Sequence, residues 1–462
     1  MVLWGQGGLP LGKKWVCSTT NAEARSVVVC SEGANMATVL LISSLDTRRK
    51  EILLLKEYIK KEGCNVLIMD ISMGTVVENV ADYGCAEVAK AGGSSFDAIS
   101  ESSDTNKNMD CMVKGARRIA EDLYEKSEIQ GIAGFGGTSN VTVISLVMKK
   151  LPFGFPKLIL SSSAAIPALA ARFFADTDIV MFHSCVELNG LNYFVKDALS
   201  RFAALIGGVL HRRTGAEGHG REAIALTEFK FAEGCAERVR KLLEQRGLEV
   251  VPFSATGASD RIMEEMVSKG LFKGVVDLVP SGLSEALLGG NRSAGLDRLG
   301  RELEGSVPVI LTPCGFDMIS CGPYERKDTD PYWKKKRIGE RKLFVPDKYR
   351  VQARTTRREM ELIGRVFAER LNKAGTTVAV FIPLRGFSAL SRENGPLHDP
   401  QADSGFLRVL RARANRQKVE IHEMDCAIDD PEFAEAIVDR FVHMVMTPTR
   451  KRGSLIGDNR GE

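Results

Sequence analysis

Short, uninterrupted apolar runs recur along this chain, and segments with the apolar spacing of helices separate them. Strands buried on both faces of a parallel sheet have this continuous apolar character, whereas half-exposed strands alternate. The pattern therefore predicts an α/β protein with two consecutive, doubly wound Rossmann-like domains whose sheets are mainly parallel. The first series of expected strands covers residues 39–43, 65–69, 130–133, 157–160 and 179–182, and the second covers 223–226, 249–253, 274–278, 308–312, 377–382 and 419–422.

The chain length also favours two domains, because 462 residues exceed what one hydrophobic core usually supports. We expect an N-terminal domain over 36–213, a linker over 214–220 and a C-terminal domain over 221–447. Residues 1–35 and 448–462 are expected to be a disordered extension and tail. Expected helices cover 47–62, 109–126, 141–148, 191–211, 233–246, 259–269, 356–373 and 431–446. Residues 323–349 break the rhythm and are expected to be a long, charged loop, with a lid or an anionic-partner patch as the alternative.

Composition excludes some classes of protein. The net charge is only +4 and the positive residues are dispersed, so we expect no nucleic-acid partner. No apolar run approaches the ~18 residues of a membrane span, so we expect a soluble, cytoplasmic protein without membrane contact. The ten cysteines form no Cys-x-x-Cys pair, and only six histidines accompany them, so no metal-ligand set is predicted.

The most informative motif is a glycine turn between a strand and a helix. It contains Gly134, Gly136, Gly137, Thr138 and Ser139. Glycines let main-chain N–H groups approach a ligand, and the following helix directs its positive end at an anion such as a phosphate. The turn is neither a P-loop nor a complete dinucleotide fingerprint, because position 139 is serine. A crossover that binds nothing is the open alternative.

Polar residues at other expected strand ends would join this turn, because ligands collect at the carboxyl ends of parallel strands. If a nucleotide is bound, hydroxyl and N–H groups would hold phosphate oxygens, and a carboxylate could reach a ribose or Mg²⁺. We therefore predict a site for ATP and Mg²⁺, although Asp46 could equally be a helix N-cap. The further candidates are Asp46, Thr47, Arg48, Asp70, Ser72, Ser161, Ser162, Glu187 and Asn192.

A second ligand surface is predicted in the C-terminal half, where glycine-containing turns follow three expected strands. Its candidate residues are Thr256, Gly257, Asp317, Gly386 and Ser388, and ordinary turn chemistry is the alternative for each. No nucleophile and base are tied together by the sequence, so the catalytic residues are unknown. Cys314 and Cys321 are expected to be inert buried thiols.

The ordered set of motifs resembles one family, the uncharacterised two-domain proteins that include the tomato mosaic virus resistance protein. The resemblance runs from about residue 36 to about residue 445. It rests on segments that begin at Asp46, Asp70, Gly134, Leu151, Ala255, Asp317, Gly322, Pro383, Asp399 and Glu432.

This resemblance implies an N-terminal ATP-binding domain, a second α/β domain of unknown activity and a homodimer. For the plant member it also implies capture of a viral protein. The chain departs from the family where Ser139, Asn140 and Val141 replace Gly-Gly-Thr, where Ser254 replaces a His, and where Gly282 replaces a Glu.

Two functions follow from these observations. One is a nucleotide-binding protein. An extended form of this hypothesis is an enzyme that acts on a small metabolite between the two domains. The other is a module that captures a protein partner, with weak or lost nucleotide binding. Whether ATP is hydrolysed or only bound stays open.

Overall fold

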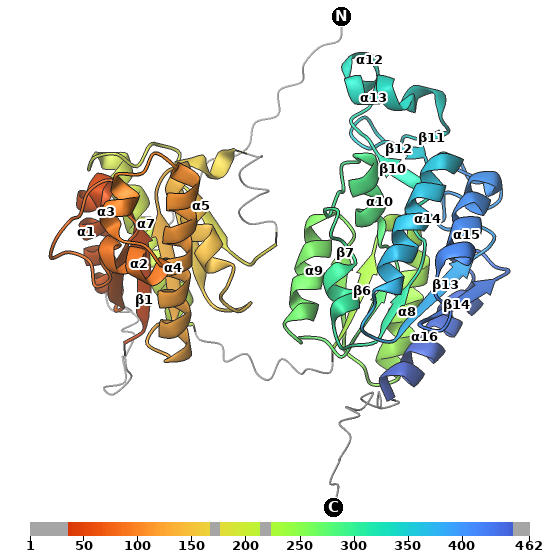
Figure 1. Cartoon of the computed structure of the whole chain (residues 1–462), viewed down its shortest axis with the longest axis horizontal. Coiled ribbons are helices and arrows are strands. Elements are labelled where there is room, and N and C mark those ends of the chain that lie inside the picture. The colour runs from red at the N-terminus through yellow and green to blue at the C-terminus, as the bar shows by residue number, and fades with distance from the viewer. Residues whose placement is uncertain (1–35, 167–175, 213–222, 447–462) are drawn as a thin grey trace, which may run out of the picture. The chain divides into compact units, whose positions relative to one another are not determined.

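The computed structural model describes residues 36–166, 176–212 and 223–446 (Figure 1). The expected extension 1–35, linker 214–220 and tail 448–462 lie outside the described residues. Within them, two large parallel sheets flanked by helices confirm the predicted α/β fold class. Each domain is described by itself below.

The N-terminal domain has one parallel sheet in the order β2-β1-β3-β4-β5. Its strands are β1 (Thr38–Ser43), β2 (Asn65–Asp70), β3 (Gly131–Phe135), β4 (Lys157–Ser161) and β5 (Val180–His183). Its helices are α1 (Leu45–Lys61), α2 (Cys85–Gly92), α3 (Phe96–Ser100), α4 (Thr105–Glu125), α5 (Thr138–Met148), η1 (Ser162–Ala165) and α7 (Tyr193–His211). One apolar core joins α1 and α7 to the sheet, and another joins α2, α3, α4 and α5 to its opposite face.

Strand β1 lies between β2 and β3 and pairs in parallel with both. After β1 the chain first adds β2 on one side of β1, and it then returns to add β3, β4 and β5 on the other side. Such a change of direction is a topological switch point, and the loops that leave the carboxyl ends of the two strands diverge there. This geometry places the ends of β1 and β3 where an open α/β sheet binds ligands.

The C-terminal domain has a sheet in the order β14-β13-β9-β8-β6-β7, again parallel. Its strands are β6 (Ile224–Glu228), β7 (Val250–Ser254), β8 (Gly274–Asp277), β9 (Val309–Leu311), β13 (Val378–Pro383) and β14 (Val419–Met424). One face is covered by α9 (Ala258–Ser268), α10 (Ser281–Leu288), α11 (Gly300–Glu304), α14 (Arg357–Asn372) and α15 (Pro400–Arg413). The other face is covered by α8 (Glu233–Gln245), which follows η2 (Lys230–Ala232), and by α16 (Pro431–Met446).

The expectation of a long loop over 323–349 is wrong. The segment folds together with its flanks into a small unit that contains α12 (Arg326–Thr329), α13 (Pro331–Lys336), η3 (Ile338–Glu340) and the antiparallel strands β10 (Met318–Ser320), β12 (Gln352–Arg354) and β11 (Leu343–Phe344). It has its own core of Cys321, Trp333, Ile338, Val351 and Ala353. These elements are too short to show the periodic apolar spacing of a helix or strand. The prediction of a loop was therefore based on the charged residues alone.

A buried charge cluster fixes α9, β8 and α11 to one another. The fully buried Arg298 guanidinium contacts Asp277 at 2.6 Å, Glu264 at 3.0 Å, Asp260 at 3.2 Å and Glu302 at 3.3 Å. Four carboxyl groups around one cation cannot all be ionised cheaply in a dry interior. Accordingly, burial raises the pKa of Glu302 well above its ordinary value, and the negative charge of Asp277 adds to the rise.

Candidate functional site

Hydrogen bonds join the loops that follow β1, β3 and β4. The Ser43 hydroxyl donates to the main-chain oxygen of Phe135 at 2.9 Å, and the Ser44 hydroxyl donates to Asn140 Oδ1 at 2.8 Å. The Ser161 hydroxyl donates to the main-chain oxygen of Gly136 at 2.7 Å. The structure thus brings the predicted glycine turn together with the hydroxyl groups at the ends of β1 and β4.

Helix α5 begins at the switch point without a side-chain cap. It starts at Thr138, and Gly137 is its N-cap, whereas the sequence predicted a start at residue 141. Three main-chain N–H groups in its first turn, those of Thr138, Ser139 and Asn140, have no hydrogen-bond partner among the residues the structure describes. A Cβ built on Gly137 would meet no atom of the described residues within 4 Å. The end of α5 therefore offers amide donors beside open space.

The Asn140 side chain covers Gly136. Gly136 has φ +151°, and a Cβ built on it would lie 2.6 Å from Asn140 Nδ2. Only glycine fits this backbone position and this contact. The space over Gly136 is therefore occupied, and any anion at this turn would lie over Gly137 and the first turn of α5. Gly134 lies inside β3, where a Cβ would collide with Ile144, so its role is close packing of the strand against α5.

Two predicted carboxylates lie at the adjacent strand ends. Asp70 Oδ1 accepts hydrogen bonds from the Leu45 main-chain N–H at 3.0 Å and from both the main-chain N–H and the hydroxyl of Ser72. The Ser72 hydroxyl oxygen in turn accepts from the Asp46 main-chain N–H at 3.1 Å. Asp46 is not the helix N-cap, since α1 begins at Leu45 and Ser44 takes that position.

One oxygen of each carboxylate accepts no N–H or O–H group. Asp46 Oδ1 and Asp70 Oδ2 are buried and have no such donor in the described part of the chain, although the Cys85 thiol interacts with the Asp70 carboxylate. Orphaned buried oxygens are rare in native proteins and call for an explanation. The charge of Asp70 is also felt by Cys85, because burial, and then the Asp70 carboxylate, raise the pKa of that thiol to about 12. Carboxylate oxygens without N–H or O–H donors are of the kind that Mg²⁺ binds together with phosphate oxygens.

The remaining predicted residues of this domain are less favourably placed to bind a ligand at the switch point. Asn192 accepts from the Val195 main-chain N–H at 3.0 Å and so caps α7. Thr47 and Glu187 are exposed, and the Arg48 guanidinium donates to the neighbouring Thr47 main-chain oxygen. Ser162 is half-buried in η1.

The sequence-based search missed Glu51. Its buried carboxylate accepts from the Gly190 main-chain N–H at 2.6 Å and ties the loop before α7 to α1. The only signal for it was its position in the Asp46-Thr47 motif, which does not reveal a contact 139 residues away.

In the C-terminal domain the structure unites two of the five predicted residues. The Ser388 hydroxyl donates to Asp317 Oδ2, both side chains are fully buried, and Asp317 Oδ1 has no partner within the described residues. Thr256 is exposed and donates to the Ser254 main-chain oxygen.

The two predicted glycines of this domain serve close backbone approach. A Cβ on Gly257 would lie 2.6 Å from the Ser293 main-chain oxygen, and one on Gly386 would lie 2.6 Å from Arg392 Cα. Neither glycine therefore needs a ligand to explain it. Cys314 and Cys321 are buried as expected, and burial raises the pKa of both thiols, that of Cys321 to about 12.

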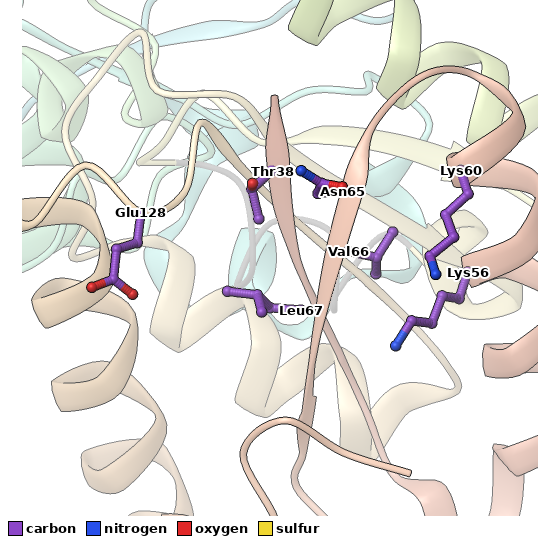
Figure 2. Close-up of a pocket in the computed structure, with 7 residues that line it drawn as sticks. All are labelled: Thr38, Lys56, Lys60, Asn65, Val66, Leu67 and Glu128. Atoms are coloured by element: carbon purple, nitrogen blue, oxygen red, sulfur yellow. The ribbon is translucent and has the colours of Figure 1, made fainter. Parts of the chain in front are cut away.

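A surface depression of about 490 Å³ lies at the opposite edge of the N-terminal sheet (Figure 2). It is lined by Thr38, Lys56, Lys60, Asn65, Val66, Leu67 and Glu128. Thr38 and Asn65 are the first residues of β1 and β2, so the depression is at the amino ends of the strands. Figure 2 shows the two lysines on one side of the strands and Glu128 on the other, so the depression does not concentrate one sign of charge.

Neither metal-ligand groups nor membrane-spanning helices are found among residues 36–166, 176–212 and 223–446. These residues contain no group of three or more His, Cys, Asp or Glu side chains arranged to hold a metal ion by themselves. No helix within them is long and apolar enough to cross a membrane.

The chain is a two-domain α/β protein. The carboxyl end of its first sheet has a switch point, the position at which open α/β sheets bind ligands. Family models agree: the N-terminal domain model of the Uncharacterised protein family (UPF0261) matches residues 37–215, and the C-terminal domain model matches residues 221–445. The chain belongs to the UPF0261 family.

Relatives come from bacteria and from tomato. A UPF0261 protein of Clostridium tetani is 31% identical over 408 residues, which cover 88% of this chain and 98% of the relative. The ToMV resistance protein Tm-1(GCR237) of Solanum lycopersicum is 30% identical over 339 residues, covering 72% of this chain but only 44% of the tomato protein. The match to the solved UDP-N-acetylglucosamine 2-epimerase of Rickettsia bellii has 9% identity and a TM-score of 0.23, and it covers 59% of this chain and 84% of that one.

Proposed function

We propose that the N-terminal domain binds a nucleotide, ATP together with Mg²⁺, at the carboxyl edge of its sheet. The observation that carries the proposal is the uncapped start of α5 at the switch point, with three unpartnered N–H groups and open space at Gly137. Unsatisfied amide groups and the helix dipole make such an end favourable for phosphate oxygens.

Asp46 and Asp70 would hold the metal ion, because each keeps one buried oxygen that accepts no N–H or O–H group of the described residues. Mg²⁺ is typically bound by one or two carboxylates together with phosphate oxygens and water. The bound ion would neutralise phosphate charge beside these carboxylates. No residue of this edge is assigned a role in catalysis, so the proposal is for binding.

Capture of a protein partner is the second candidate. The observation that favours it is the Asn140 side chain, which fills the space over Gly136 and narrows the turn. Under this alternative the domain would bind ATP weakly or not at all.

Gly137→Val tests the proposal. Gly137 has φ −79° and free space around its Cβ position, so valine fits the folded chain and places its methyl groups where phosphate would bind. We expect the affinity for MgATP, measured by isothermal titration calorimetry, to fall about tenfold or more, which corresponds to about 1.4 kcal/mol or more. Gly136→Val is unsuitable, since it would collide with Asn140 and strain the backbone.

Gly84→Val is the matched control. Gly84 is the N-cap of α2 and has φ −72°, and a Cβ there meets no atom within 4 Å in the part of the chain that the structure describes. This variant should bind MgATP like the unmodified protein. Absence of binding to the unmodified protein at millimolar MgATP would reject nucleotide binding and leave protein capture as the candidate.

A further inference from the structure

Two adjacent aromatic side chains at the start of α7 are exposed to an unusual degree. Tyr193 is 77% exposed and Phe194 is 64% exposed, and their ring centroids are 5.5 Å apart with an interplanar angle of 75°. Exposed aromatic groups of this size often mark a binding surface. We refer to Tyr193 and Phe194 as the aromatic pair.

The aromatic pair lies at the same edge of the sheet as the start of α5. All five strands are parallel, so the loop that leaves β5 at His183 starts at the edge where β1 and β3 also end. That loop reaches α7 at Tyr193, and the bond from the Gly190 main-chain N–H to Glu51 holds it against α1. Helix α1 itself begins at the switch point.

The two ends of such a site would lie on opposite faces of the sheet, because α5 packs on one face and α7 packs with α1 on the other. Between the two faces, at the carboxyl ends of the strands, lies the hydroxyl-rich end of β4 with Ser161 and Ser162. A nucleotide with its phosphates at α5 would cross the strand ends near β4 and bring its base to the start of α7.

We propose that the aromatic pair is the base-stacking element of the nucleotide site. This inference rests on the proposed function and adds to it that the ligand must carry a planar aromatic base. Every nucleobase has a π-face, so aromatic side chains bind bases without needing a particular hydrogen-bond pattern. The pair therefore selects nucleotides over inorganic polyphosphates and discriminates weakly among bases.

The test compares MgATP with magnesium tripolyphosphate, which has phosphates but no base, on the full chain. We expect the double variant Tyr193→Ala/Phe194→Ala to bind MgATP about tenfold more weakly and tripolyphosphate unchanged, by calorimetry. Because both side chains are exposed, the variant should fold normally. Tyr193→Phe keeps the ring and should retain the affinity for MgATP, and Tyr349→Ala, which removes a 67% exposed ring of the C-terminal domain, should have no effect.

The outcomes separate this inference from the proposed function. If the unmodified protein binds neither ligand, the nucleotide site itself is rejected, and the base-stacking role falls with it. If the double variant binds MgATP as tightly as the unmodified protein, only the role of the aromatic pair is rejected. A change from dimer to monomer in light scattering with unchanged MgATP affinity would also reject that role, because the pair would then be a contact between two copies of the chain.

Discussion

At the scale of single residues, Arg298 shows how a buried charge is made tolerable. One cation faces Asp260, Glu264, Asp277 and Glu302, and four ionised carboxyl groups around it would be costly in a dry interior. Burial raises the pKa of Asp260, Glu264 and Glu302, most strongly that of Glu302. The positive charge of Arg298 therefore stabilises the cluster, and the raised pKa of Glu302 favours its neutral acid form.

Substitution of Glu302 and substitution of Arg298 should change the free energy of unfolding by very different amounts. Glu302→Gln should change the free energy of unfolding at pH 7 by less than about 1 kcal/mol, because the amide resembles the neutral acid in size. Arg298→Met should cost about 3–5 kcal/mol, because it leaves buried carboxylates without a counter-charge. Chemical denaturation measures both values, and a large loss for Glu302→Gln would show that Glu302 is ionised.

Asp403 gives a pH-dependent prediction. Burial raises its pKa to about 6, although Arg354 opposes the rise, whereas an unfolded chain has an aspartate pKa of about 3.9. Between these values the folded state binds more protons than the unfolded state, so this group's contribution to stability falls as pH rises from about 4 to about 6.

Asp403→Asn tests this dependence, because asparagine stays neutral throughout. The stability of the variant relative to the unmodified protein should therefore improve by about 2–3 kcal/mol between pH 4 and pH 7. Urea denaturation at both pH values measures the change. A difference that stays constant with pH would contradict the raised pKa.

Residue chemistry was only partly predictable from the sequence. Polar residues at strand ends were found, because short hydroxyl and carboxyl side chains after apolar runs are easy to recognise. The hydrogen-bond partners of these residues were not predicted, because a side chain that can cap a helix can equally bind a ligand. Asn192 caps α7, and the N-cap of α1 is Ser44 rather than Asp46. Contacts such as that between Glu51 and Gly190 depend on the tertiary fold, which no local pattern encodes.

At the scale of elements, the long strands and helices were predictable and the short ones were not. The strands expected from continuous apolar runs are all present, with ends that differ by a few residues. The short helices α2, α3, α10 and α11 were missed, and so were the longer helix α15 and the unit formed by α12, α13, β10, β11 and β12. In that unit the core residues are isolated among charges, so Trp333 gave no periodic signal although its side chain is fully buried.

This small unit should open when its largest core residue is removed. The Trp333 indole N–H donates to the Cys321 main-chain oxygen at 2.9 Å, and the ring packs edge to face against Tyr324. Trp333→Ala should therefore cost about 3–5 kcal/mol within the unit. Limited proteolysis should then cut the variant within 321–353 first, while Tyr349→Ala stays resistant; equal resistance of both would show that Trp333 does not hold the unit.

At the scale of the whole molecule, the same architecture occurs twice. In each sheet the first strand of the domain pairs with the second on one side and the third on the other, β1 with β2 and β3, and β6 with β7 and β8. In the C-terminal domain the Thr227 hydroxyl joins the ends of β6 and β8, since it donates to Asp277 and accepts from the Val279 main-chain N–H. In the N-terminal domain the Ser43 and Ser44 hydroxyls join the segments that follow β1 and β3. The proposal of a nucleotide at the first sheet rests on the start of α5 beside these bonds.

The most direct measurement is a crystal structure of the full chain soaked with ATP and Mg²⁺. We expect phosphate density at the main-chain N–H groups of Thr138, Ser139 and Asn140, with a metal ion beside Asp46 and Asp70. Crystals whose first-sheet edge stays free of ligand at millimolar ATP, or that hold the phosphates at another edge, would contradict it.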